Sequence, residues 1–370
     1  MKQSNVLLIK RNLEMGEKYF MPRQADNRVP TLYDVAQLAQ VSVATVSHVL
    51  NPDSEKYVSN ELRHRIVAAA SQLGYRPNIL ARSMRGKRRK TIAIIVPKFE
   101  NILFTRTVMA AEQVAYNAGY VLLICNTYDN PERERVYIEH LLSQQVDGFI
   151  IAPTIEGLVS TKPLRDLKIP YVIVDRQLNG LPLDSYDYIG FDNQVGAEIA
   201  TQYLIDRGHR DIAFVGSDSR NHRINERYIG FRSAIIRNGL NLANCPIALG
   251  QETREEGIQL TNQILKNDNI TALFAGHQYL AEGIIMSFHQ NKIRIPEDLS
   301  IVVYGGPTWA ELSDPPLTHV KMPDIELGGP AAKNLIERIE GNRMKTEQII
   351  LNPILVPGQS VIDGPEKFSR

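Results

Sequence analysis

The sequence is poor in cysteine and tryptophan, with two cysteines and one tryptophan in 370 residues. Cys125 and Cys245 stand far apart, so they form neither a disulfide framework nor the spacing of metal ligands. We therefore expect a reducing, cytoplasmic location. The apolar run at 6–9 is too short for the core of a signal peptide, and no stretch is long and apolar enough to span a membrane.

Common catalytic signatures are also missing. The sequence contains no phosphate loop of the GxxxxGK[ST] type, no GxSxG nucleophile elbow and no HExxH zinc motif. Two acid-containing pairs remain, Asp175–Arg176 and Asp192–Asn193, but Asp192 is better placed to cap a helix. A sugar-processing enzyme therefore stays a weak alternative.

A net charge of +1 hides an uneven distribution of charge along the chain. Residues 1–90 contain 16 Lys and Arg against 7 Asp and Glu, whereas residues 91–370 contain 26 against 34. A basic module joined to an acidic body favours nucleic-acid binding by the basic part, because phosphate neutralisation dominates such affinity.

The basic part contains three predicted helices. Thr31 with Asp34 has the spacing of a capping box, and apolar residues follow at helical intervals. A turn at 40–41 leads to Ser42, a second cap, and to a short helix at 43–50. A third helix is predicted at about 59–73. Spacing alone fits any three-helix bundle as well as a helix-turn-helix, and the positive charge favours the helix-turn-helix.

The composition changes at Thr91. Continuous apolar segments such as TIAIIV, YVLLICN and DGFIIAP alternate with helical segments, and the pattern restarts after Gly190 with DIAFVG, TALFAG and LSIVVY. Buried strands alternating with helices predict parallel sheets covered on both faces. About 280 residues with such a restart predict two α/β lobes, with a ligand cleft beyond the carboxyl ends of their strands.

These motifs identify a family resemblance. The segments TLYDVA, VSVATVSHVLN and GYRPN-x-x-ARSM, with ERYIGF and GHRDIAFV further on, resemble the lactose/galactose repressor family of bacterial transcription regulators. The resemblance covers nearly everything from Thr31 to Ile362 and implies an α + α/β chain. Its parts would be a helix-turn-helix headpiece with a hinge helix, then a two-lobed, periplasmic-binding-protein-like (type I) effector domain with parallel sheets.

The resemblance also sets the expected boundaries. The headpiece is expected at 29–76, the hinge helix and basic linker at 77–90, and the effector domain at 91–362. Within that domain, lobe 1 is expected at about 91–190 and 318–345, and lobe 2 at 191–317 and 346–362. A tail follows at 363–370. Residues 1–28 have no counterpart in the family; they are either a disordered basic arm or the product of an early start codon.

The resemblance implies a role for each DNA-contacting position. Base contacts are expected from Val43, Ala44, Thr45 and His48, since His48 can donate to guanine and the Ala44 methyl can lie against a thymine methyl. Phosphate contacts are expected from Thr31, Tyr33, Ser42, Ser47 and Asn51. The hinge and minor-groove residues are expected to be Asn78, Ala81, Met84 and Arg85.

Met84 stands where the family inserts a leucine into the central base step of the minor groove. Methionine is apolar and flexible, so we expect it to act as a wedge; packing within the linker is the alternative. The basic run at 85–90 is expected to add phosphate contacts.

The effector site departs from the family pattern. Five residues are expected to bind the effector: Phe104, Arg223, Arg227, His277 and Gln278. Acids or amides common in the family are replaced by Lys98, by His277–Gln278 and by Gly305–Gly306. A cleft that keeps its arginines and loses acids favours an anion such as a sugar phosphate, a nucleotide-like compound or a carboxylate.

The expected partners are therefore operator DNA, a second copy of the chain and a small anionic, carbohydrate-related effector. No cofactor or metal is expected. The alternative is a regulator of the same family that has lost its ligand or is controlled by a protein corepressor. The direction of control, activator or repressor, and the operator sequence stay open.

Overall fold

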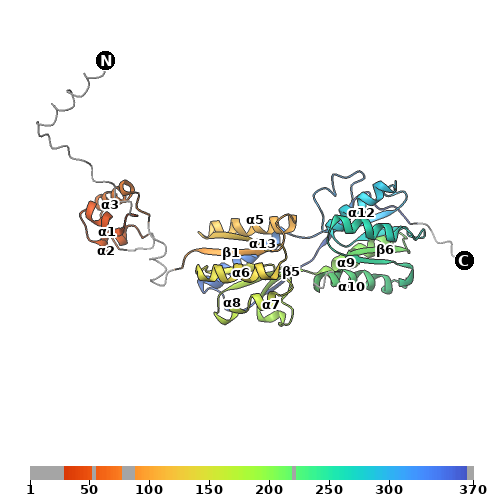
Figure 1. The fold of residues 1–370 in the computed structure, drawn as a ribbon, viewed down its shortest axis with the longest axis horizontal. Helices are drawn as coiled ribbons and strands as arrows, with labels where there is room; N and C mark the ends of the chain where they lie inside the picture. The colour runs from red at the N-terminus through yellow and green to blue at the C-terminus, as the bar shows by residue number, and fades with distance from the viewer. Residues whose placement is uncertain (1–28, 52–55, 77–87, 219–221, 365–370) are drawn as a thin grey trace, which may run out of the picture. The chain divides into compact units, whose positions relative to one another are not determined.

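A computed structural model describes residues 29–51, 56–76, 88–218 and 222–364. The chain divides into two compact units, residues 1–87 and 88–370, each of which is described by itself. Figure 1 colours them from red through yellow and green to blue along the chain.

The first unit contains three short helices, α1 (Leu32–Leu38), α2 (Val43–Val49) and α3 (Asn60–Leu73). Their N-terminal capping residues confirm the positions at which these helices were expected to begin. Thr31 and Asp34 form the capping box of α1, and the side chain of Ser42 accepts a hydrogen bond from Thr45 N at 3.1 Å. The helices bury one small core: Val35, Ala36, Ala39, Val46, Val49, Ile66, Ala69 and Ala70.

The second unit begins with a six-stranded sheet whose order is β11-β5-β4-β3-β1-β2. All its pairings are parallel. The strands are β1 (Thr91–Val96), β2 (Val121–Asn126), β3 (Gly148–Ile151), β4 (Tyr171–Val174), β5 (Asp187–Phe191) and β11 (Gln348–Leu351). The helices are α5 (Ile102–Asn117), α6 (Pro131–Ser143), α7 (Gly157–Ser160), α8 (Lys162–Asp166) and α13 (Ile325–Glu340), with a 3-10 turn at Leu183–Ser185.

A second six-stranded sheet has the order β12-β10-β9-β8-β6-β7 and is parallel except for the pairing of β12 with β10. Its strands are β6 (Ile212–Ser217), β7 (Ile247–Gly250), β8 (Ala272–Ala275), β9 (Ser300–Tyr304), β10 (Thr318–Lys321) and β12 (Ile354–Val356). Its helices are α9 (Asn193–Asp206), α10 (His222–Arg237), α11 (Arg254–Ile264) and α12 (Gln278–Gln290), with a 3-10 turn at Leu242–Asn244.

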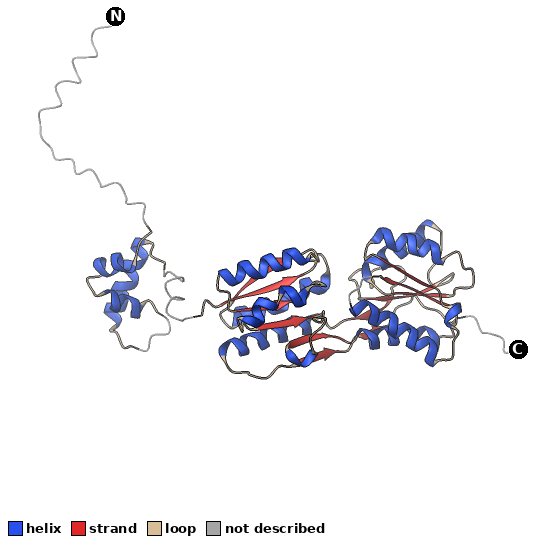
Figure 2. Cartoon of the chain, turned by 60° about the horizontal axis from the view of Figure 1, so that its bottom comes forward, coloured by secondary structure: helices blue, strands red, loops and turns tan. Residues whose placement is uncertain are grey.

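Helices cover both faces of each sheet (Figure 2). In the first lobe, α5 and α13 pack together on one face and α6 lies on the other, where Ile138 and Leu141 enter a separate apolar cluster. In the second lobe, α9 and α10 cover one face while α11 and α12 cover the other. The predicted α/β layers are therefore confirmed.

The expected lobe boundaries need correction at the two later crossovers. Residues 318–321 were expected in lobe 1, but they form β10 and pair with β9 of the second sheet. Residues 348–351 were expected in lobe 2, but they form β11 and pair with β5 of the first sheet. Neither four-residue segment contains a local signal for one sheet or the other, so strand pairing decides the lobe.

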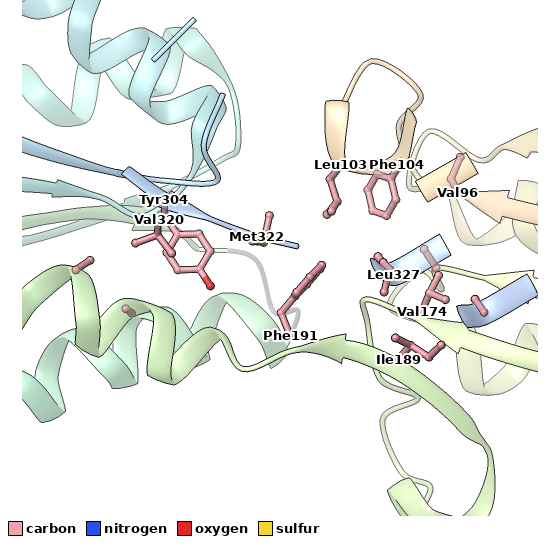
Figure 3. Packing of buried hydrophobic residues seen from close by; sticks show 14 of the residues in the cluster. Val96, Leu103, Phe104, Val174, Ile189, Phe191, Tyr304, Val320, Met322 and Leu327 are labelled. Atoms are coloured by element: carbon pink, nitrogen blue, oxygen red, sulfur yellow. The ribbon is translucent and has the colours of Figure 1, made fainter. Parts of the chain in front are cut away.

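One apolar cluster continues from lobe to lobe. Figure 3 shows Phe191 and Met322, beside two of the crossovers, between Tyr304 of the second sheet and Phe104 and Leu327 of the first lobe. All five side chains are at least nine-tenths buried. This cluster places the carboxyl ends of β1 and β9 near the same junction, which we call the interlobe junction.

Candidate functional site

The outer face of α2 contains the residues expected to read bases. Val46 and Val49 are buried, whereas Val43, Ala44 and His48 are exposed. The turn before α2 is tight, because Gln40 adopts a left-handed backbone with φ of 52° and Val41 N donates to the Ala36 carbonyl at 3.0 Å. Buried apolar residues thus hold the helix from one side and leave small and polar residues on the other.

The residues expected to contact phosphates differ in their exposure and in the hydrogen bonds of their side chains. Tyr33 is exposed at the start of α1. The Thr31 hydroxyl donates to the Asp34 carboxylate at 2.7 Å, and the Ser42 hydroxyl lies 2.8 Å from that of Thr45. Thr31 and Ser42 therefore serve as caps in this structure; Ser47 and Asn51 lie at the partly exposed end of α2.

The expected hinge residues Asn78, Ala81, Met84 and Arg85 lie outside the described residues, and their roles remain predictions. The end of the basic run is described. Its last two side chains contact the effector domain, and the phosphate contacts expected of the run stay a prediction.

Arg89 Nη2 donates to Gln145 Oε1 at 2.8 Å, and Lys90 Nζ pairs with Glu340 at 2.9 Å over the ring of Tyr120. The hydrogen bond to Glu340 raises the pKa of Lys90. Both side chains hold the segment directly before β1 against the rest of the first lobe.

Arg227 is the most firmly held of the expected effector residues, with 3% of its surface exposed. Its Nε donates to Asn193 Oδ1 at 3.1 Å, and its Nη1 donates to the Gly276 carbonyl at 2.9 Å. The Tyr304 ring lies 4.1 Å from its Cζ, and the Tyr304 hydroxyl donates to the same Asn193 oxygen at 3.0 Å. Three groups therefore fix the guanidinium: Asn193 of α9, the Gly276 carbonyl after β8, and the Tyr304 ring of β9.

The other expected effector residues occupy different surroundings. Phe104 is 3% exposed and belongs to the apolar cluster (Figure 3). Gln278 Nε2 donates to Asn101 Oδ1 at 2.9 Å, which joins α12 of the second lobe to the start of α5 in the first. His277 caps α12 through Tyr279 N. The side chain of Arg223 is outside the described part.

The sequence interpretation missed a carboxylate at this junction. Glu252 follows β7, and its Oε2 lies 3.4 Å from His277 Nε2. Burial acts to raise its pKa, but His277, Arg176, Arg227 and Lys98 together outweigh burial and hold the pKa of Glu252 below its usual range. The expected loss of acids is thus incomplete.

Arg176 belongs to the first lobe, where it follows β4. It forms an ion pair with Asp129, with one Nη2–Oδ2 distance of 3.2 Å, and Nη1 also donates to the Pro153 carbonyl. The sequence interpretation named Arg176 only in an acid-containing pair and did not name Glu252. The rule that ligands bind beyond strand carboxyl ends is the signal that would have included both.

Other kinds of site are not found in the described ranges. Among these residues no three His, Cys, Asp or Glu side chains are grouped so that they could hold a metal ion. The described helices include none that is long and apolar enough to cross a membrane.

Comparison with known proteins agrees with this architecture. Residues 31–78 match the model for bacterial regulatory proteins of the lacI family, and residues 201–361 match a periplasmic binding protein-like domain. The chain is 32% identical over 335 residues to the HTH-type transcriptional repressor PurR of Photobacterium profundum, covering 90% of this chain and 99% of that protein. It is 31% identical to the ribose operon repressor of Escherichia coli K12, covering 88% and 98%.

Solved structures show the same fold. A LacI family transcriptional regulator from Enterococcus faecium with bound ribose gives a TM-score of 0.68 at 27% identity, covering 74% of this chain and all of that one. The lac repressor dimer bound to operator gives a TM-score of 0.79 at 24% identity, covering 90% and 100%.

The chain therefore belongs to the lacI family of bacterial regulatory proteins. It is a DNA-binding transcription regulator whose helix-turn-helix is followed by an effector domain of the periplasmic binding protein type. The curated relatives named above are repressors, not enzymes, in agreement with the sequence interpretation.

Proposed function

We propose that the protein is a homodimeric repressor that binds a pseudo-palindromic operator. One headpiece reads one half-site, so the two-fold symmetry of a dimer is mirrored in the DNA. The outward face of α2 supports Val43, Ala44, Thr45 and His48 as base-reading residues. Met84 is proposed as the minor-groove wedge, with Asn78, Ala81 and Arg85 beside it in the sequence.

Replacing His48 by alanine tests the base-reading role. We expect His48→Ala to weaken operator binding by about 1–3 kcal/mol and to relax specificity at one base pair per half-site, because a donor to a base edge is lost. Binding to random-sequence DNA should change little. Fluorescence anisotropy with operator, base-substituted operators and random duplex at one salt concentration measures all three.

His64 offers a matched control. It lies exposed on α3, so His64→Ala removes the same side chain from a helix that is not proposed to enter the major groove. We expect wild-type affinity for this variant. An equal loss on operator and random DNA for His48→Ala would reject base reading.

We propose further that the effector is a small, carbohydrate-related anion bound at the interlobe junction. The supporting observation is the set of cations there: Lys98 and Arg176 of the first lobe and Arg227 of the second help to keep the pKa of Glu252 low, although burial acts in the opposite direction. An anionic group gains strength from charge-assisted hydrogen bonds with arginine. The names of two similar proteins add support for a pentose, since one is a ribose operon repressor and another was solved with ribose.

Ligand binding can be tested on the full chain with two matched probes, ribose 5-phosphate and ribose. We expect ribose 5-phosphate to raise the unfolding temperature and ribose to do so less. A ligand at about 100 times its Kd stabilises the native state by about 2.7 kcal/mol. Isothermal calorimetry then gives the two affinities. Tighter binding of ribose would reject the anion, and failure of a wide panel of anionic and neutral metabolites would leave a protein corepressor as the better explanation.

A further inference from the structure

A side-chain hydrogen bond joins the two lobes of the effector domain across the interlobe junction. Gln278 is the first residue of α12 in the second lobe, and its Nε2 donates to Asn101 Oδ1 at 2.9 Å. Asn101 is the N-cap of α5 in the first lobe. Gln278 is 9% exposed and Asn101 is partly buried, so the hydrogen bond is only partly open to competition from water. The bond therefore connects the amino ends of two helices from different lobes.

Asn101 is held in position for this contact by its own lobe. Its Oδ1 also accepts a hydrogen bond from Leu103 N at 3.0 Å, and its backbone N–H donates to the Lys98 carbonyl at 3.3 Å. The first bond caps α5, and the second closes a turn between β1 and α5. Both lone pairs of the Asn101 oxygen are thus used, one within the first lobe and one toward the second. The cap of α5 therefore fixes the acceptor that Gln278 meets.

A second contact joins the same two segments. Lys98 follows β1, and its Nζ lies 5.6 Å from the centre of the Tyr279 ring, which is within the range of a cation–π interaction. Tyr279 is the second residue of α12, next to Gln278. The turn at 98–101 and the start of α12 are thus joined through two neighbouring pairs of side chains.

Gly305, directly after β9, lies beside the Gln278 side chain. Its backbone has a φ of 116°, which residues with a Cβ rarely adopt, and an added Cβ would lie 3.4 Å from Gln278 Cβ and 3.7 Å from its Oε1. A side chain at 305 would therefore begin against Gln278. Lys98, Gln278 and Gly305 are all positions at which the sequence departs from the family pattern, and the fold brings them together at this contact between the lobes.

We propose that Asn101 and Gln278 form a latch that holds the two lobes together, and that Gln278 affects ligand binding through this latch and not as a ligand contact. The inference goes beyond the proposed effector, because the latch acts whether the ligand is an anion or a neutral sugar. A latch raises the population of the state in which the lobes are closed, so less of the binding free energy of a ligand is used to close them. Breaking the latch at either end should therefore have the same effect.

Two substitutions break the latch from opposite ends. Asn101→Ser keeps a cap on α5, since serine is a preferred N-cap, but its hydroxyl is too short to reach Gln278. Gln278→Met keeps the length of the side chain and removes the donor. Gln202→Met and Asn238→Ser are the matched controls, because Asn238 Nδ2 donates to Gln202 Oε1 at 2.8 Å within the second lobe.

Hydrogen–deuterium exchange of the full chain without ligand measures the latch. We expect hydrogen-bonded amides at the starts of α5 and α12, such as those of Thr105 and Ala281, to exchange about 2- to 10-fold faster in Asn101→Ser and in Gln278→Met. The double variant should exchange no faster than either single variant, because the same bond is lost in each. Peptides of β1 and β8 should exchange as in wild type, which separates opening of the junction from a general loss of stability. The two control variants should leave all these rates unchanged.

Ligand binding then separates a latch from a direct contact. Calorimetry with ribose 5-phosphate and with ribose should show the same loss of affinity, about 2- to 10-fold, in Asn101→Ser, in Gln278→Met and in the double variant. A loss in Gln278→Met that is absent from Asn101→Ser would make Gln278 a ligand contact and overturn the latch. Exchange at the wild-type rate in both single variants, or faster exchange in the double variant than in either, would also overturn it. Absence of binding of either probe to wild type would count against the proposed effector alone, since the exchange rates still decide the latch.

Discussion

The variant Arg227→Met is expected to lose most of its affinity for an anionic effector. Methionine has a similar length and keeps the contact with the Tyr304 ring, but it removes the charge and both hydrogen bonds. Truncating one partner of a buried, hydrogen-bonded charge pair costs about 2–5 kcal/mol, which is at least about thirtyfold in Kd. Calorimetry with ribose 5-phosphate measures the loss, and effector-dependent operator binding should disappear with it.

The same substitution at Arg237 provides the control. Arg237 lies on the same helix, but its side chain is 58% exposed and pairs with Glu198. Arg237→Met should bind the effector as wild type does. A folded Arg227→Met protein that keeps its affinity for ribose 5-phosphate would show that Arg227 supports the junction without touching the ligand.

Much of the headpiece could be predicted because its signals are local. A capping box, a cap at Ser42 and apolar residues at helical spacing are each read within one turn of chain, and the observed helices begin where these signals lie. The same holds for the buried strands: β1 and β6 are continuous apolar runs with nearly every residue buried.

The lobe boundaries could not be read from local signals. The strands β10 and β11 are four residues long, and neither sequence indicates which sheet the strand joins. Which sheet each strand joins depends on the path of the crossovers, and α13 between them packs on α5 of the first lobe. Strand pairing decided the assignment, with β9 for β10 and with the distant β5 for β11, and the sequence pattern contains no information on these partners.

Only part of the effector site could be predicted, and the reason is similar. Arg227 stands in a recognisable motif, whereas Glu252 and Arg176 stand in loops that follow different strands and come together only in the folded lobes. The basic run at 85–90 was interpreted from composition alone. Composition does not indicate that Arg89 and Lys90 find Gln145 and Glu340 more than 50 residues away.

We expect Gly328→Ala to destabilise the effector domain strongly. Gly328 lies in α13 where that helix meets α5, and a Cβ atom there would be 1.9 Å from the Thr107 carbonyl oxygen and 2.7 Å from its carbon. These are backbone atoms of a packed helix, so the methyl group must force the helices apart. Overpacking of this kind costs about 1–3 kcal/mol or more, which exceeds the gain of about 1 kcal/mol in helix propensity.

Thermal and urea unfolding of the full chain measure this effect, and Lys333→Ala on the same helix is the control. The Lys333 side chain is 69% exposed and lies 4.0 Å from Glu337, so its removal should change the free energy of unfolding by less than about 0.5 kcal/mol.

The substitution Gly328→Ala should also weaken the effect of ligand on operator binding. The helix α5 starts at the interlobe junction, and α13 ends at Glu340, which pairs with Lys90, so the two helices connect these places only while they stay packed together. Wild-type stability in Gly328→Ala would mean that α5 and α13 can move apart at little cost, and the helix pair would then be too loose to link ligand and operator binding.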